Sequence, residues 1–109
     1  MAPPTTDPVH ITARDNPLLQ RIRKLQQDPN AYRKQGEVWL EGDHLCRACV
    51  ARGRPALQAV MTESAWADTV LRALGKQAAR LAIVPDALFA SLSGLESPAR
   101  IGFVVTHES

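Results

Sequence analysis

Residues 33–45 read Arg-Lys-Gln-Gly-Glu-Val-Trp-Leu-Glu-Gly-Asp-His-Leu, and they predict a strand, a turn and the start of a helix. Its Val-Trp-Leu run at 38–40 is short, apolar and flanked by polar residues, as in a buried strand. Gly42 permits backbone angles that other residues avoid, and Asp43 carries an oxygen suited to capping a helix. Residues 45–52 then follow as a helix. A strand, a tight turn and a helix form the unit of open α/β sheets, which bind ligands at their strand ends.

The length and composition indicate one ordinary globular domain. The chain has 109 residues, of which 45% are hydrophobic and 22% charged, and its formal net charge is only +2. The distribution of charge is more informative, because six basic residues and three acidic ones precede Gln35. A basic patch is therefore expected on the first third of the chain if the fold brings these side chains together.

The sequence contains no apolar run long enough to cross a bilayer, so we expect no transmembrane helix. The proline-rich start lacks the basic and apolar parts of a signal peptide. We expect residues 1–10 to be a disordered lead, with a short extended segment over 9–12. A cytoplasmic location follows as an expectation, with both cysteines reduced.

The apolar pattern predicts four strands that alternate with helices. The expected strands are 38–40, 56–61, 81–84 and 101–105, and the expected helices start at Asn16-Pro17, near Pro29, at Asp43, at Thr62 or Ser64, and at Asp86. This order predicts an α/β fold, a three-layer α/β/α sandwich with a mostly parallel four-stranded sheet. Side chains expected to point inward are Leu18, Ile22, Leu25, Leu45, Cys49, Val70, Leu71, Leu74, Leu88, Phe89 and Leu92, with Cys46 and Val50 as further candidates.

The sequence contains no catalytic residues at the spacing of a known motif. Cys46 and Cys49 supply half of a zinc site, with His44 as a conceivable third ligand, but the pair sits inside a helix and is better explained by packing. Glu41 and Asp43 are better explained by the positive end of a helix than by acid–base chemistry. The sequence has no nucleophile elbow, phosphate loop or dinucleotide fingerprint. Catalysis by this chain alone finds no support, and no metal is expected.

The basic residues favour RNA as a partner. Arg21 and Lys24 are spaced to share one helix face, and Arg33 and Lys34 directly precede the central strand. Arginine grips phosphate through two hydrogen bonds, and lysine adds charge. Tyr32 offers a stacking surface for an unpaired base, whereas Trp39, in the middle of a strand, is expected in the core.

Several segments together resemble the SpoU (TrmH-type) RNA ribose methyltransferases. Ile11-Thr12, Asn16-Pro17 with Leu25, and residues 33–42 are similar to the start of that family's substrate-binding domain. Residues 84–89, Leu92-Ser93 and residues 97–105 are similar to its end. The resemblance therefore runs from about residue 11 to residue 105. The sequence departs from the family at Asp43-His44, where an arginine is common, and at 94–96, where the loop is usually rich in threonine.

The resemblance implies a small α/β/α domain, like ribosomal proteins that bind kinked RNA. Residues 11–105 would hold tRNA or rRNA, and residues 106–109 would begin a linker to a separate C-terminal methyltransferase domain. That second domain is knotted, binds S-adenosylmethionine and methylates a ribose 2′-hydroxyl, usually within a homodimer. Its Ser-Leu-Asn segment is absent from this sequence. We therefore expect neither catalysis nor a cofactor in this chain.

Under this interpretation the RNA-binding residues fall into two groups. One set would neutralise phosphates: Arg14, Arg21, Lys24, Arg33 and Lys34. A second set, Asn16, Glu41 and His44, would contact RNA or shape the loop that does. A helical bundle, or an acidic surface around Gly42, would contradict the RNA-binding interpretation as a whole.

Two alternatives remain open. The first is a protein-interaction or dimerisation module that orients the methyltransferase domain. The second is a small thiol enzyme, which requires a thiol of lowered pKa at Cys46 or Cys49.

Overall fold

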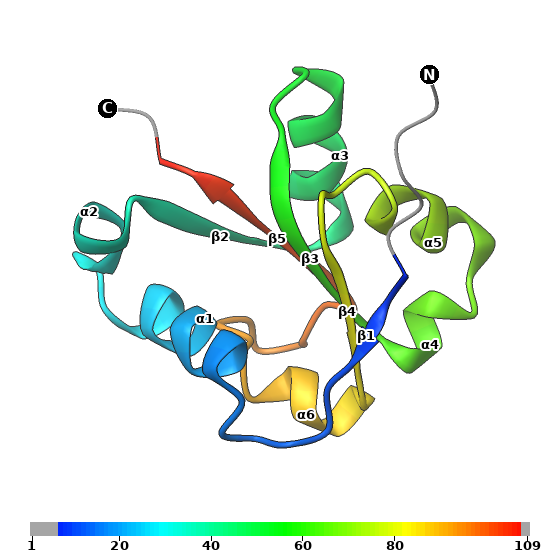
Figure 1. Ribbon diagram of the computed structural model, residues 1–109, viewed down its shortest axis with the longest axis horizontal. Helices are drawn as coiled ribbons and strands as arrows, with labels where there is room; N and C mark the ends of the chain where they lie inside the picture. Colours follow the sequence, from blue (N-terminus) through cyan, green and yellow to red (C-terminus); the bar gives the residue numbers. More distant parts are fainter. Residues whose placement is uncertain (1–6, 108–109) are drawn as a thin grey trace.

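The computed structural model describes residues 7–107, and its centre is a five-stranded sheet in the order β1-β4-β3-β5-β2 (Figure 1). The strands are β1 (Val9–His10), β2 (Glu37–Glu41), β3 (Ala56–Thr62), β4 (Leu81–Val84) and β5 (Ile101–Thr106). The helices are α1 (Pro17–Gln27), α2 (Ala31–Gln35), α3 (Asp43–Ala51), α4 (Glu63–Trp66), α5 (Thr69–Gly75) and α6 (Asp86–Ala90). The predicted α/β class is confirmed.

The sheet is mostly but not fully parallel. β1, β4 and β3 pair in parallel, whereas β5 runs antiparallel to both of its neighbours, β3 and β2. β2 consequently points in the same direction as β3. The prediction of four strands was one short, because Val9 and His10, which we placed in the lead, pair with Ala82 and Ile83. The extended segment expected over 9–12 includes these two residues, but so short a segment carries too little apolar pattern to predict that it pairs in the sheet.

Helices cover both faces of this sheet and make the predicted three layers (Figure 1). Alternate residues of β3 show the division, since Ala59 and Met61 join one buried cluster and Val60 joins the other. The first cluster is closed by buried residues of α3, α4 and α5, and the second by residues of α1 and α6. The α1–α6 face also receives Trp39, whose ring packs against Phe89 with centroids 6.2 Å apart. Trp39 therefore belongs to the core, as predicted.

The start of α1 follows the sequence rules. The side-chain oxygen of Asn16 accepts a hydrogen bond of 2.9 Å from the backbone N–H of Leu18, and Pro17 occupies the first helical position. The buried face of α1 is centred on Leu19 and Ile22, so the predicted Leu18 and Leu25 lie at its margins and are only partly buried.

Three local predictions were wrong, each for a local reason. Asp43 does not cap α3: Gly42 occupies the cap position at φ 106°, and Asp43 lies in the first turn, where it pairs with Arg47. Leu45 points outward, because the inward face of α3 is set by the two cysteines. Val70 is 61% exposed, because Asp68 starts a separate helix by accepting hydrogen bonds from Val70 and Leu71.

The described helices are short. The longest, α1, has 11 residues, and within residues 7–107 no helix has the length and apolar character needed to cross a membrane.

Candidate nucleic-acid interface

The sheet has two ends, and the predicted site residues are divided between them. We define the carboxyl end as the segments that follow β1 to β4 (11–16, 42–44, 63–68 and 85–86) together with 91–100, which leads into β5. We define the amino end as the segments that precede β2, β3 and β4 (31–36, 52–55 and 76–80) together with His107. Arg14, Asn16 and His44 lie in the segments of the carboxyl end, and Glu41, the last residue of β2, adjoins them. Arg33 and Lys34 lie at the amino end, and Arg21 and Lys24 lie on α1.

Glu41 holds the carboxyl end together. Its carboxylate accepts hydrogen bonds from the hydroxyl of Ser93 and from the backbone N–H groups of Gly94 and Ala99, the latter two at 3.1 Å. The last residue of β2 is thus fastened to the segment 91–100. Of the two roles expected of Glu41, these contacts support the shaping of the loop.

Arg14 lies beside a basic residue that the predicted set omitted. The guanidinium of Arg23 donates a 2.6 Å hydrogen bond to the backbone carbonyl of Arg14 and another of 2.9 Å to the hydroxyl of Ser91. Desolvation and, second, the charge of Arg14 lower the pKa of Arg23. The structure therefore gathers two arginines next to the start of α1, where the side chain of Asn16 is occupied in capping the helix.

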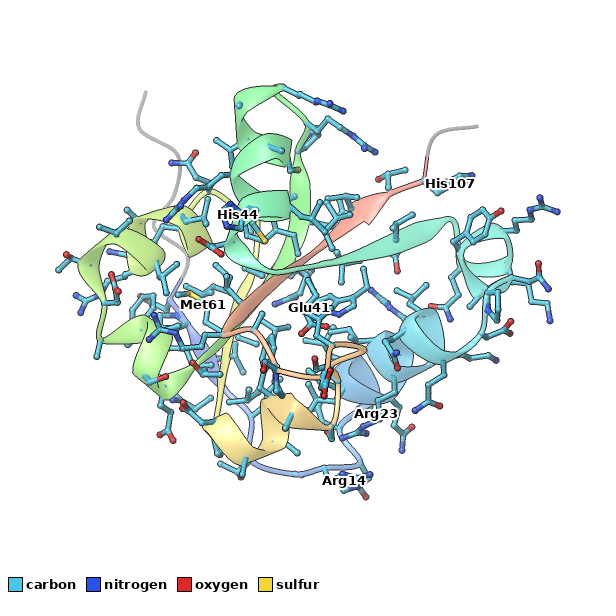
Figure 2. The ribbon with its side chains drawn as sticks, turned by 180° about the vertical axis from the view of Figure 1, so that it is seen from behind. Arg14, Arg23, Glu41, His44, Met61 and His107 are labelled. Atoms are coloured by element: carbon cyan, nitrogen blue, oxygen red, sulfur yellow. The ribbon has the colours of Figure 1, made fainter. Side chains whose placement is uncertain are left out.

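His44 is separated from this pair. It is exposed on α3, which covers one face of the sheet, whereas α1 covers the other (Figure 2). The structure does not unite His44 with Arg14 and Arg23 in one patch.

Three of the four remaining basic residues are exposed without strong partners. Arg21 pairs with Glu37 at 3.1 Å, whereas the side chains of Lys24 and Lys34 meet no hydrogen-bond or ion-pair partner among residues 7–107. Arg33 donates a 2.9 Å hydrogen bond to the hydroxyl of Tyr32, and its guanidinium lies 5.5 Å from the centre of the Tyr32 ring. These contacts leave Lys24, Arg33 and Lys34 able to meet phosphate.

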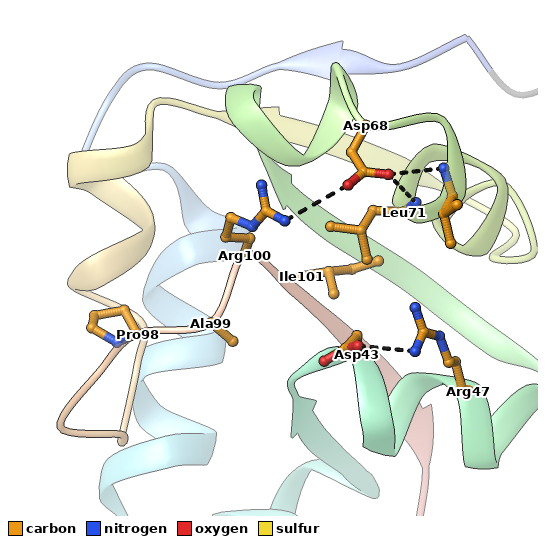
Figure 3. Close-up of a pocket in the computed structure, with 9 residues that line it drawn as sticks. Asp43, Arg47, Asp68, Leu71, Pro98, Ala99, Arg100 and Ile101 are labelled. Atoms are coloured by element: carbon orange, nitrogen blue, oxygen red, sulfur yellow. Dashed lines mark hydrogen bonds and ion pairs between the residues drawn. The ribbon is translucent and has the colours of Figure 1, made fainter.

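A pocket of about 410 Å³ opens at the carboxyl end (Figure 3). Leu71 and Ile101 are among its apolar lining residues, and two ion pairs border it: Arg47 with Asp43 at 3.1 Å, and Arg100 with Asp68 at 3.8 Å. The two cations and two carboxylates balance, so the surface around Gly42 is mixed rather than acidic. Sequence reasoning omitted both arginines. The spacing of Asp43 and Arg47, four residues apart in a helix, was the available signal for Arg47.

Both cysteines, Cys46 and Cys49, are buried within α3. The thiol of Cys46 lies 3.8 Å from the carbonyl oxygen of Leu40. Burial, and next the neighbouring Cys49 and Asp43, raise the pKa of Cys46 to about 12. A thiol nucleophile requires the opposite shift, so the thiol-enzyme alternative is wrong for Cys46. Within residues 7–107 no three His, Cys, Asp or Glu side chains are grouped to hold a metal ion.

Comparison with known sequences gives one partial relationship. No family model matches the chain. A stretch of 54 residues, 50% of this chain, is 39% identical to an uncharacterized tRNA/rRNA methyltransferase of Synechocystis sp. and corresponds to 19% of that protein.

Solved structures share the fold over most of the chain. A crystal structure of an RNA 2′-O ribose methyltransferase matches 90% of this chain at a TM-score of 0.75 and 19% identity. An rRNA methyltransferase from Sinorhizobium meliloti matches 91% at 0.70 and 15% identity, and the SpoU methyltransferase AviRb from Streptomyces viridochromogenes matches 86% at 0.65 and 21% identity. The resemblance expected from the sequence is confirmed at the level of the fold. This chain spans 37%, 37% and 36% of those three chains.

Proposed function

We propose that residues 11–105 form the RNA-substrate-binding domain of a SpoU-type RNA 2′-O-ribose methyltransferase that acts on tRNA or rRNA. The observation that carries the proposal is the match of 90% of this chain to 37% of an RNA 2′-O ribose methyltransferase at a TM-score of 0.75. The exposed cations Lys24, Arg33 and Lys34 supply the charge that phosphate binding needs.

In this proposal the chemistry belongs to a separate domain. A C-terminal methyltransferase domain, reached through a linker that follows β5, would bind S-adenosylmethionine and transfer its methyl group to a ribose 2′-hydroxyl of the RNA, within a homodimeric parent enzyme. Because the sequence lacks the family's Ser-Leu-Asn segment, we assign cofactor binding to that separate domain. The task left to this chain is to bind and orient RNA.

The test is RNA binding by the chain itself. Fluorescence anisotropy with labelled, transcribed tRNA should show salt-dependent binding. The titration is repeated between about 50 and 200 mM salt, because a protein with several phosphate contacts loses about 10³–10⁵ in affinity over this range. The double variant Arg33→Ala/Lys34→Ala should bind more weakly and with a smaller salt slope. Binding of the same strength by the variant would remove both residues from the interface.

The competing interpretation makes a different prediction. A protein-interaction or dimerisation module would show no salt-dependent affinity for tRNA and would self-associate in sedimentation velocity. That pair of results would replace the RNA-binding proposal.

A further inference from the structure

Basic residues precede three successive strands of the parallel set. Arg33 and Lys34 precede β2, Arg52 and Arg54 precede β3, and Lys76 and Arg80 precede β4. The segments that hold them, 31–36, 52–55 and 76–80, contain no acidic residue. The segments at the carboxyl end contain six acidic residues, Asp15, Asp43, Glu63, Asp68, Asp86 and Glu96, against the two arginines Arg14 and Arg100. The molecule is therefore electrically polarised along its strands.

Backbone and side-chain contacts make the amino end one continuous surface. The guanidinium of Arg54 donates a 2.9 Å hydrogen bond to the carbonyl of Thr106, which joins the start of β3 to the end of β5. The backbone N–H of His107 donates to the carbonyl of Gly36 at 2.8 Å, which joins β5 to the start of β2. The backbone N–H of Ala59 donates to the carbonyl of Arg80 at 2.8 Å, so β4 begins beside β3. The basic segments thus lie in a row across four neighbouring strands.

A hollow of about 280 Å³ lies in this surface. Val38, Leu40 and Val105 give it apolar walls, and Arg54 and His107 provide its polar groups. The rings of His107 and Tyr32 pack in an edge arrangement with their centroids 4.7 Å apart. Figure 2 shows His107 at the opposite end of the molecule from Arg14 and Arg23. Apolar and aromatic surface beside cations is the arrangement that holds unpaired bases while arginine or lysine meets their phosphates.

We propose that single-stranded RNA docks on the amino end of the sheet, with phosphates on Arg52, Arg54 and Arg80 and an unpaired base over the Val38–Leu40 hollow. The inference rests on the proposed function and specifies its surface. It moves the contact away from the carboxyl end, where the arginines bordering the pocket are already paired with Asp43 and Asp68. Charge complementarity selects the occupant, because the five cations Arg33, Lys34, Arg52, Arg54 and Arg80 outnumber the nearby carboxylates Asp7 and Glu37 and attract a polyanion.

The decisive experiment compares equal losses of charge at the two ends. Arg52→Ala/Arg80→Ala removes two exposed cations that meet no hydrogen-bond or ion-pair partner within the described part of the chain, so the fold should be unaffected. Arg47→Ala/Arg100→Ala removes two cations from the carboxyl end. With a labelled single-stranded RNA, loss of two phosphate contacts should make the negative slope of log K against log salt shallower by about 1.4 for the first variant. The second variant should keep the wild-type slope.

The outcomes separate this inference from the proposed function. If the wild-type chain binds RNA and only Arg47→Ala/Arg100→Ala makes the salt dependence of log K shallower, the amino end is not the docking surface, although the proposed function stands. If the wild-type chain binds no RNA, the proposed function fails with it. Heparin is a polyanion without bases and serves as a competitor. If heparin displaces the RNA only when its charge is in large excess, the result supports specific docking over general polyanion binding. Displacement at equal charge would overturn specific docking.

Methyl NMR supplies a second readout that does not depend on affinity. Titration of the wild-type chain with the same RNA should shift the methyl signals of Val38 and Leu40 and leave those of Val70, in the pocket at the carboxyl end, in place. Shifts confined to Val70 would refute the proposed surface.

Discussion

The carboxylate of Glu41 accepts a hydrogen bond from the backbone N–H of Ala99, which lies 58 residues further along the chain. The same carboxylate receives Ser93 and Gly94, so one side chain closes the loop that leads from α6 into β5. Because β5 lies between β2 and β3, this closure fixes how the antiparallel strand β5 enters the sheet.

Replacing Glu41 with alanine should destabilise the fold. Three donors would lose a charged acceptor, and unsatisfied donors of this kind cost about 1–3 kcal/mol each when buried, less here because part of the loop reaches water. We expect a loss of about 2 kcal/mol in urea unfolding. Glu96→Ala, in the same loop, is the matched control, because Glu96 is exposed and contacts no partner among residues 7–107; it should stay within about 0.5 kcal/mol of wild type. Equal effects of the two variants would contradict the anchoring role.

The parts of the fold that the sequence predicted are those set by local chemistry. Asn16-Pro17 started a helix and Gly42 made the turn after β2, because capping and glycine conformations act over a few residues. The antiparallel direction of β5 and the pairing of Val9 with Ala82 depend on partners far along the chain. An apolar run signals a strand but not its direction, so these features had no local signal.

The candidate site likewise has residues that the local sequence identifies and residues that only the fold brings together. A count of charges along the chain identified Arg33 and Lys34, which precede β2. It did not identify Arg52 and Arg80, because only the strand order brings the starts of β3 and β4 beside the start of β2 and the end of β5. The grouping of these cations in three dimensions follows from the sheet topology. The first third of the sequence contains only some of the cations that the topology brings together.

Gly102 is required by the ring of Trp39. A Cβ atom at position 102 would stand 2.1 Å from the Cη2 atom of Trp39 on the neighbouring strand. Gly102→Ala should therefore cost about 1–3 kcal/mol through overpacking and should change the near-UV circular dichroism of tryptophan. Gly94→Ala is the control, because its Cβ would meet only the flexible end of Gln26, which is able to move aside. A Gly102→Ala variant as stable as Gly94→Ala would show that the Trp39 ring is not held in place.

Cys46 should resist alkylation while the chain is folded. Its folded pKa of about 12 exceeds the ordinary thiol value of about 8.5, so the native state retains the proton that the unfolded state releases. This contribution to stability is fully present below about pH 8.5 and is lost as the pH rises toward 12. Iodoacetamide labelling at pH 8.5, read by mass spectrometry, should follow the rate of unfolding. Fast labelling of the native chain would contradict the burial of this thiol, and Cys46→Ala should flatten the alkaline loss of stability.

Ser64 should control the titration of Asp86. The hydroxyl of Ser64 donates a 2.6 Å hydrogen bond to the Asp86 carboxylate, and this bond is the main reason that the pKa of Asp86 lies below its ordinary value. A carboxyl group with a lowered folded pKa stabilises the fold above the unfolded value of about 3.9, and the contribution is lost as the pH falls through the folded pKa. Ser64→Ala should raise the pKa of Asp86 in a ¹³C-detected NMR titration and make acid unfolding begin at higher pH. Ser97→Ala, an exposed serine that meets no side-chain partner within residues 7–107, should leave both unchanged. An Asp86 titration that is the same in both variants would assign the lowered pKa to the remaining influences, the Ser64 and Asp86 backbone N–H groups and the charge of Arg100.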